Sequence, residues 1–127
     1  MKPTLSVIMP AYMEAQNIQA AVASTVRALE KSGLADYEII ILTGNRPDGT
    51  NDGTPEIAAG LAQSLLRVRA IHNQDFSQMG AKYWHGVQAA KFDYITLVPS
   101  DNETEEETVS QIARRTGEAE MIISYTV

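Results

Sequence analysis

The chain has 127 residues, of which 44% are hydrophobic, and this size and composition predict one folded domain over residues 1–127 with a core of ordinary density. Asp and Glu number 16 against 10 Lys and Arg, a formal net charge of −6, which disfavours proteins that neutralise the phosphate backbone of nucleic acid. Cysteine is absent, which excludes disulfides and thiolate metal sites.

Apolar runs alternate with stretches of helical periodicity along the chain. The nearly continuous apolar runs predict strands buried on both faces, at residues 5–9, 37–42, 66–71, 94–98 and 121–125. Between them, apolar side chains recur at the spacing of amphipathic helices, as at Ile18, Val22, Val26 and Leu29. This alternation predicts a Rossmann-like three-layer α/β/α fold with a mostly parallel sheet.

Two helix starts carry capping residues. Thr54-Pro55 predicts an N-cap followed by proline at the first helical position, and Thr104 with Glu107 predicts a capping box for the last helix. The turns between the predicted strands and helices lie beyond the carboxyl ends of the strands, where open α/β sheets bind ligands. The candidate site residues are therefore expected in these turns.

The first predicted strand runs into Pro10, Tyr12 and Glu14. Proline has no N–H to donate to a strand neighbour, so Pro10 ends regular pairing and leaves Tyr12 and Glu14 in the turn above the sheet. From there the two side chains can face a base and a ribose. The alternative is that Pro10 only ends the strand and Glu14 favours the start of the next helix electrostatically.

The turn after the second predicted strand, TGNRPDGTNDGT at residues 43–54, is rich in glycine and acceptor groups. Glycine allows a main chain to approach a ligand closely. Asp48 can accept a hydrogen bond from the imide or amide edge of a nucleobase. For Asp52 we favour a structural role in the turn.

The segment FSQMGAKYWHG after the third predicted strand introduces a helix. Its first amides, together with Gly80 and Lys82, are placed to meet a phosphate. We interpret Tyr83 and Trp84 as packing residues.

The fourth predicted strand ends in VPSDNE, which presents Ser100 and Asp101 at the edge of the sheet. A carboxylate there suits Mg²⁺ or Mn²⁺ shared with a diphosphate, because such ions are commonly held by few carboxylates plus substrate oxygens. The acids at residues 105–107 are better explained by the dipole of the last helix and a solvated face.

Four segments, in order, carry a family resemblance: LSVIMPAYMEAQNI, DGTNDGT, GAKYWHGVQAA and DYITLVPSDNE. Together they resemble the amino-terminal half of family 2 glycosyltransferases with the GT-A fold, in particular the dolichol-phosphate mannose synthase and polyprenyl-phosphate sugar transferase branch. The resemblance spans nearly the whole chain.

The resemblance implies which residues bind the nucleotide and any metal. Asp101 occupies the second acidic position of the family's Asp-x-Asp motif and is the candidate ligand of Mg²⁺ or Mn²⁺. Three departures stand out: Met13 replaces the usual asparagine before Glu14, Pro99 replaces the first acid of the metal motif, and TGNR lengthens the approach to Asp48. The predicted binding residues are Pro10, Ala11, Tyr12, Glu14, Asp48, Gly80, Ser100 and Asp101.

The resemblance also implies an activity, the inverting transfer of a sugar from a UDP- or GDP-sugar to a polyprenyl phosphate or glycan acceptor. The family's base carboxylate comes from its carboxyl-terminal half, so we expect a truncated domain with no catalytic residue of its own. The alternative is a non-catalytic nucleotide-binding or interaction module derived from such a transferase. We expect a cytoplasmic protein or one at the membrane periphery, and self-association through an exposed sheet edge.

Overall fold

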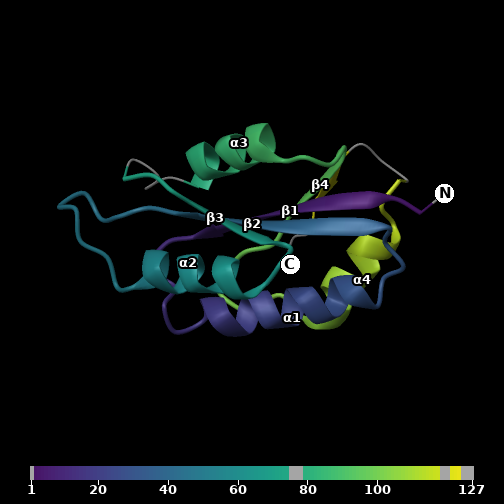
Figure 1. Ribbon diagram of the computed structural model, residues 1–127, viewed down its shortest axis with the longest axis horizontal. Helices are drawn as coiled ribbons and strands as arrows, with labels where there is room; N and C mark the ends of the chain where they lie inside the picture. The colour runs from purple at the N-terminus through teal and green to yellow at the C-terminus, as the bar shows by residue number, and fades with distance from the viewer. Residues whose placement is uncertain (1, 75–78, 118–120, 124–127) are drawn as a thin grey trace.

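The computed structural model describes residues 2–74, 79–117 and 121–123. Strands and helices alternate through these residues, as the hydrophobic pattern predicts (Figure 1). In chain order the elements are β1 (Thr4–Ala11), α1 (Ile18–Glu30), β2 (Asp36–Thr43), α2 (Thr54–Ser64), β3 (Val68–His72), α3 (Met79–Ala89), β4 (Tyr94–Leu97), α4 (Glu106–Arg114) and β5 (Met121–Ile123).

The strands form one sheet in the order β3-β2-β1-β4-β5, and each neighbouring pair is parallel. Helix α3 covers one face of the sheet, whereas α1, α2 and α4 cover the other (Figure 1). The predicted three-layer α/β/α fold with a parallel sheet is therefore confirmed. Strand order reverses between β1 and β4, because the chain first builds outward from β1 to β3 and then crosses back.

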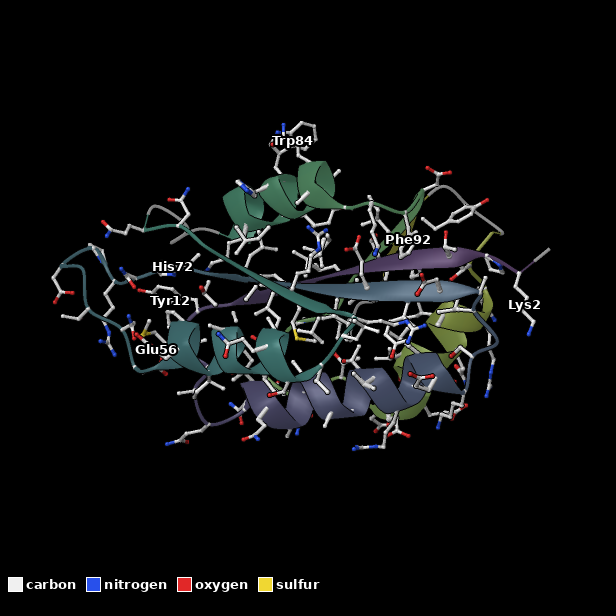
Figure 2. All side chains as sticks on the ribbon, in the orientation of Figure 1. Lys2, Tyr12, Glu56, His72, Trp84 and Phe92 are labelled. Atoms are coloured by element: carbon white, nitrogen blue, oxygen red, sulfur yellow. The ribbon has the colours of Figure 1, made fainter. Side chains whose placement is uncertain are left out.

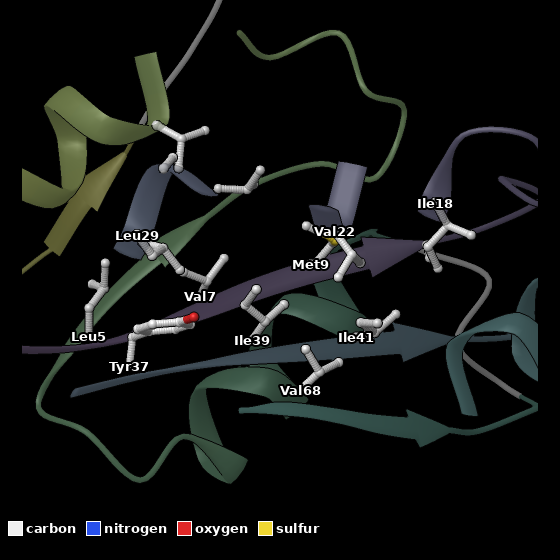
Figure 3. Packing of buried hydrophobic residues seen from close by; sticks show 14 of the residues in the cluster. Leu5, Val7, Met9, Ile18, Val22, Leu29, Tyr37, Ile39, Ile41 and Val68 are labelled. Atoms are coloured by element: carbon white, nitrogen blue, oxygen red, sulfur yellow. The ribbon is translucent and has the colours of Figure 1, made fainter. Parts of the chain in front are cut away.

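The core is divided by the sheet into two layers. Alternate residues of the central strands point to opposite faces, so Val7 and Met9 pack under α1 and α2 while Ile8 packs under α3. Figure 3 shows the larger layer, where β1 meets Ile39 and Ile41 of β2. Each of these fully buried aliphatic side chains stabilises the fold by about 1.5–3 kcal/mol.

A buried carboxylate on β2 is hydrogen-bonded to β1, to β3 and to the segment that follows α3. Glu38 of β2 is 2% exposed and accepts hydrogen bonds from Ser6 Oγ (2.6 Å), the Lys91 backbone N–H (2.7 Å) and Arg69 Nε (2.9 Å). Burial by itself raises the pKa of Glu38, but these bonds outweigh burial and hold the pKa below its ordinary value. The sequence did not predict this role, because Glu38 stands as a single charged residue within the apolar run at residues 37–42 and its partners are distant in the chain.

The start of α2 differs from the capping pattern. The N-cap of α2 is Gly53, at φ 98°, and not Thr54. Thr54 instead makes tertiary bonds, because its hydroxyl accepts from the Glu14 backbone N–H (2.9 Å) and donates to the Asp52 carboxylate. The predicted N-cap was therefore one residue too late.

The capping box predicted for α4 is wrong. The N-cap is Glu105, with no side-chain capping bond. The Glu107 carboxylate lies near Arg114 (3.6 Å) and Lys31 (3.9 Å), and Glu106 pairs with Arg27 of α1 (2.8 Å). The two glutamates lie in the first turn of α4, as the dipole interpretation expects, and Glu106 also joins α4 to α1.

Within the part of the chain that the structure describes, no helix is both long and apolar enough to cross a membrane.

Candidate functional site

A cavity of about 250 Å³ opens beyond the carboxyl ends of β1 and β4. This is the place where strand order reverses, and open α/β sheets bind ligands at such switch points. Figure 2 shows Tyr12 at the same end of the sheet as His72, which ends β3, and far from Lys2 at the other end. The cavity is lined by Pro10, Tyr12, Glu14, Lys82, Pro99, Ser100 and Asp101.

One buried hydrogen bond joins the two strand ends that form the cavity. Ser100 Oγ donates to the Pro10 carbonyl oxygen at 2.8 Å. Pro10 does not end β1, which pairs with β2 as far as Ala11. The Pro10 carbonyl points towards β4, so its missing N–H also faces that side, where the β1–β4 ladder has already ended at Ile8 and Leu97. Proline is therefore tolerated inside the strand.

Strand alternation separates Pro10 from its neighbour Ala11. The Ala11 side chain is fully buried in the core layer under α1 and α2, away from the cavity wall. Gly80 is the second residue of α3, which carries Lys82 to the cavity. Of the eight predicted binding residues, five line the cavity together: Pro10, Tyr12, Glu14, Ser100 and Asp101.

Lys82 brings a positive charge to this wall. The side chain is 2% exposed, and its Nζ lies 4.8 Å from the centroid of the Tyr12 ring, within the range of a cation–π contact. Burial lowers the pKa of the Lys82 ammonium. Tyr12 itself is 36% exposed, so its ring presents one face to the lysine and remains accessible from solvent.

The turn that carries Glu14 is held by the loop before α2. Asp52 accepts hydrogen bonds from the Ala15 backbone N–H (3.1 Å) and the Thr54 backbone N–H (3.1 Å), while Thr54 accepts from the Glu14 N–H. Asn17 Nδ2 donates to the Glu14 carboxylate at 3.0 Å. These contacts confirm the structural role of Asp52 and orient Glu14 at the cavity.

Asp48 lies outside the cavity lining, in an exposed turn. Its Oδ1 accepts from the Thr50 backbone N–H (3.0 Å) and from Thr50 Oγ1 (2.6 Å), and these bonds lower the pKa of Asp48. The turn is closed by a hydrogen bond from the Arg46 N–H to the Thr50 carbonyl (2.8 Å). Contact of Asp48 with a nucleobase stays a prediction.

The acidic groups fit a divalent cation only as a site shared with a ligand. Asp101 lines the cavity, and its Oδ1 accepts from the Glu103 backbone N–H (3.0 Å), which fixes the carboxylate. No cluster of three or more His, Cys, Asp or Glu side chains able to hold a metal lies among the residues that the structure describes. Mg²⁺ is often held by one or two carboxylates plus substrate phosphates, so Asp101 fits that arrangement.

Two cavity residues were not among the predicted binding set. Pro99 was interpreted as a departure from the metal motif, and Lys82 was expected, with Gly80, near a phosphate. The sequence signal for Lys82 was its position near the start of the helix that follows the third strand. The packing role predicted for Trp84 is wrong, since that side chain is 62% exposed on α3 (Figure 2), whereas Tyr83 packs against the core.

Comparison with known proteins agrees with this fold. The sequence profile of the family described as "Glycosyl transferase family 2" matches residues 6–125. Glycosyltransferase AglD of Haloferax volcanii is 34% identical over 112 residues, which cover 87% of this chain and 17% of AglD. The chain therefore spans a small part of this relative.

Solved structures match over most of the chain. S. aureus TarS 1–349 in complex with UDP superposes with a TM-score of 0.67 at 21% identity, covering 93% of this chain and 32% of that chain. Glucosyl-3-phosphoglycerate synthase from Mycobacterium tuberculosis in complex with UDP gives a TM-score of 0.56 at 23% identity, covering 78% of this chain and 34% of that chain. These likenesses show a shared fold. The profile match over residues 6–125 shows, in addition, that this chain belongs to glycosyl transferase family 2.

Proposed function

We propose that the cavity binds a nucleotide-diphosphate sugar, a UDP- or GDP-sugar, as the donor for inverting sugar transfer. The observation that carries this proposal is the position of the cavity at the switch point between β1 and β4, with polar and charged side chains from both strand ends. Membership of the family supports a transferase, and the UDP complexes of TarS and of the synthase support a nucleotide ligand for this fold.

The chemistry assigns roles to the cavity residues. In an inverting transfer the acceptor hydroxyl oxygen bonds to the anomeric carbon, the bond from that carbon to the phosphate oxygen breaks, and the nucleoside diphosphate leaves with the electron pair. A base takes the hydroxyl proton. Tyr12 and Glu14 would face the nucleoside, and Asp101 would hold Mg²⁺ or Mn²⁺ against the diphosphate, where the ion neutralises developing charge.

The acceptor and the base belong to the same proposal. Resemblance to the dolichol-phosphate mannose synthase branch favours a polyprenyl phosphate acceptor, with a glycan as the alternative, and a base carboxylate outside this chain. We expect a cytoplasmic protein, and a polyprenyl phosphate acceptor, which is a membrane lipid, would bring it to the membrane periphery. Release of nucleoside diphosphate from UDP- or GDP-sugars, measured with and without polyprenyl phosphate, tests the acceptor.

Calorimetric titration with UDP, GDP and their sugars, with and without Mn²⁺, tests donor binding. We expect one nucleotide to bind and Mn²⁺ to tighten its binding. The Asp101→Ala variant should lose most of the Mn²⁺-dependent gain, and Glu103→Ala, the matched control at an exposed neighbour outside the lining, should keep it. A folded sample that binds none of these nucleotides contradicts the proposal.

A non-catalytic module is the second candidate. Pro99 at the position of the first metal-binding acid favours it, because proline offers no oxygen ligand from its side chain. Nucleotide binding that is unchanged by Mn²⁺, together with no sugar transfer by the longest natural form of the protein, would support this candidate. Self-association through a sheet edge is a further expectation, which light scattering can measure.

A further inference from the structure

Lys82 is a buried cation without a carboxylate partner among the residues that the structure describes. Its side chain is 2% exposed and forms no ion pair there, and burial is the one cause acting on its pKa, which is lowered. Lysine is almost never fully buried unless it is paired, because removing an ammonium from water is costly. The protein therefore maintains a desolvated positive charge at some cost in stability.

The surroundings of Lys82 hold the charge without neutralising it. The centroid of the Tyr12 ring lies 4.8 Å from Lys82 Nζ, and the π face of the ring attracts the ammonium. This attraction is weaker than that of a carboxylate, and because the ring is uncharged it does not neutralise the ammonium. The ammonium lies on a cavity wall, so an anion entering the cavity can reach it. Such an arrangement suits an anionic ligand that displaces water when it binds.

At the end of β4 the cavity lining has one acid, where the family's metal motif has two. Among the described residues of the lining, the acids are Asp101 and Glu14, and Pro99, two positions before Asp101, has no side-chain oxygen to bind a metal. A nucleoside diphosphate carries several negative charges, and a single carboxylate holds a divalent ion weakly before the diphosphate arrives. The ammonium of Lys82, another residue of the lining, adds the positive charge that a second metal-binding acid would otherwise help to supply.

We propose that Lys82 is a diphosphate-binding residue, a fixed cation that contacts phosphate oxygens of the donor and supplies part of the positive charge that the cavity needs. This inference rests on the proposed function, since it takes the donor to be a nucleotide-diphosphate sugar. Tyr12 is the positioning residue that holds the ammonium towards the cavity. The phosphate contact comes from the side chain of Lys82 and does not require a metal ion.

The test compares the affinity for a nucleoside diphosphate with that for its nucleoside, in EDTA. UDP and GDP are titrated against uridine and guanosine by calorimetry. We expect the wild-type chain to prefer the diphosphate by about tenfold or more, since a charge-assisted hydrogen bond from a desolvated donor is strong. Lys82→Met should bring this ratio close to one and leave nucleoside affinity within about twofold, whereas Lys82→Arg should keep much of the preference.

Lys91→Met is the matched control. Lys91 Nζ also lies over an aromatic ring, that of Phe92 at 5.1 Å, but it is exposed and outside the cavity lining. This variant removes the same charge and the same kind of contact, so it should leave the ratio unchanged. Thermal melts accompany each variant, and Lys82→Gln provides a second neutral side chain if Lys82→Met does not fold.

Each outcome separates the inference from the function on which it rests. If the folded wild type binds neither nucleoside nor diphosphate, with or without Mn²⁺, the proposed function is wrong. If the wild type binds the diphosphate but shows no preference for it in EDTA, or if the neutral variants keep that preference, Lys82 is not a phosphate ligand and donor binding stands. An equal loss of nucleoside and diphosphate affinity also overturns the inference, because it indicates a damaged cavity.

Discussion

Gly86 of α3 lies directly against Ile8 of β1, because a Cβ built on Gly86 would stand 2.7 Å from Ile8 Cγ2 and 3.0 Å from Leu42 Cδ1. Real Cβ contacts are longer than this, so the close approach of α3 to the sheet depends on the missing side chain. The same helix carries Lys82 to the cavity. The packing of α3 on β1 therefore bears on both stability and ligand binding.

Gly86→Ala is expected to destabilise the protein by about 1–2 kcal/mol, since overpacking of the core outweighs the gain in helix propensity. Gly60 of α2 is the matched control, because nothing lies within 4 Å of the position that a Cβ would take there. Gly60→Ala should stabilise the protein by about 0.5–1 kcal/mol. Urea unfolding of the two variants measures the difference, and equal midpoints would show that α3 can move away from the sheet.

Met13 is held in a left-handed backbone conformation at φ 54°, in the turn between Tyr12 and Glu14. Asn102, in the turn after β4, takes a similar conformation at φ 60°. Asparagine tolerates this region better than methionine does, because its short polar side chain can bond locally. Met13→Asn should therefore raise the free energy of unfolding by about 0.5–1 kcal/mol, and Asn102→Met should lower it by a similar amount. Opposite signs in chemical denaturation are the expected result, and a loss of stability in Met13→Asn contradicts it.

Asp52 and Asp48 lie in one loop and have different expected roles. Asp52→Ala removes the hydrogen bonds to the backbone N–H groups of Ala15 and Thr54, so it should destabilise the protein by about 1 kcal/mol, a modest value because the carboxylate is exposed. Asp48→Ala removes hydrogen bonds within one exposed turn, so it should shift the urea midpoint less than Asp52→Ala does and, under the proposed function, weaken nucleoside binding. Calorimetry and denaturation on both variants distinguish the roles, and an unaltered nucleoside affinity in Asp48→Ala removes it from the site.

Glu38 is expected to make stability depend on acid pH. Its pKa in the folded protein lies below the ordinary value of 4.5, so the folded state favours the charged form. The stabilisation is present above pH 4.5 and is lost as pH falls through the lower folded pKa. Glu38→Gln should lower stability at pH 7 by about 1–2 kcal/mol and flatten this acid dependence, since the charge-assisted bonds are lost.

The control for Glu38 is an exposed acid far from the network. Glu56→Gln, in the first turn of α2, should keep the wild-type acid dependence. Urea unfolding between pH 3 and pH 7 measures the slopes, where these pH values are about one unit or more on either side of an ordinary glutamate pKa. Parallel slopes for wild type and Glu38→Gln would show that other carboxyl groups dominate acid unfolding.

The order of strands and helices followed from the sequence alone, because hydrophobic periodicity is a local property of each segment. Boundaries were less accurate where a side chain was engaged in a distant contact. Thr54 was predicted as an N-cap, but its hydroxyl bonds to the first turn of the chain. Leu66 is a miss of another kind: its apolar side chain predicted a place inside the third strand, yet it is 94% exposed and precedes β3.

The sequence by itself determined the α/β class, the family resemblance and the strand ends at which a ligand site should lie. Only the tertiary structure decided which of those residues meet. Pro10 and Ser100 are 90 positions apart yet share a hydrogen bond, and Lys82 of α3 lies against Tyr12 in the turn after β1. The same alternation that puts Pro10 on the cavity wall turns Ala11 into the core. Local periodicity predicts which segments are strands and helices, but the meeting of distant side chains depends on strand order and on the face to which each side chain points.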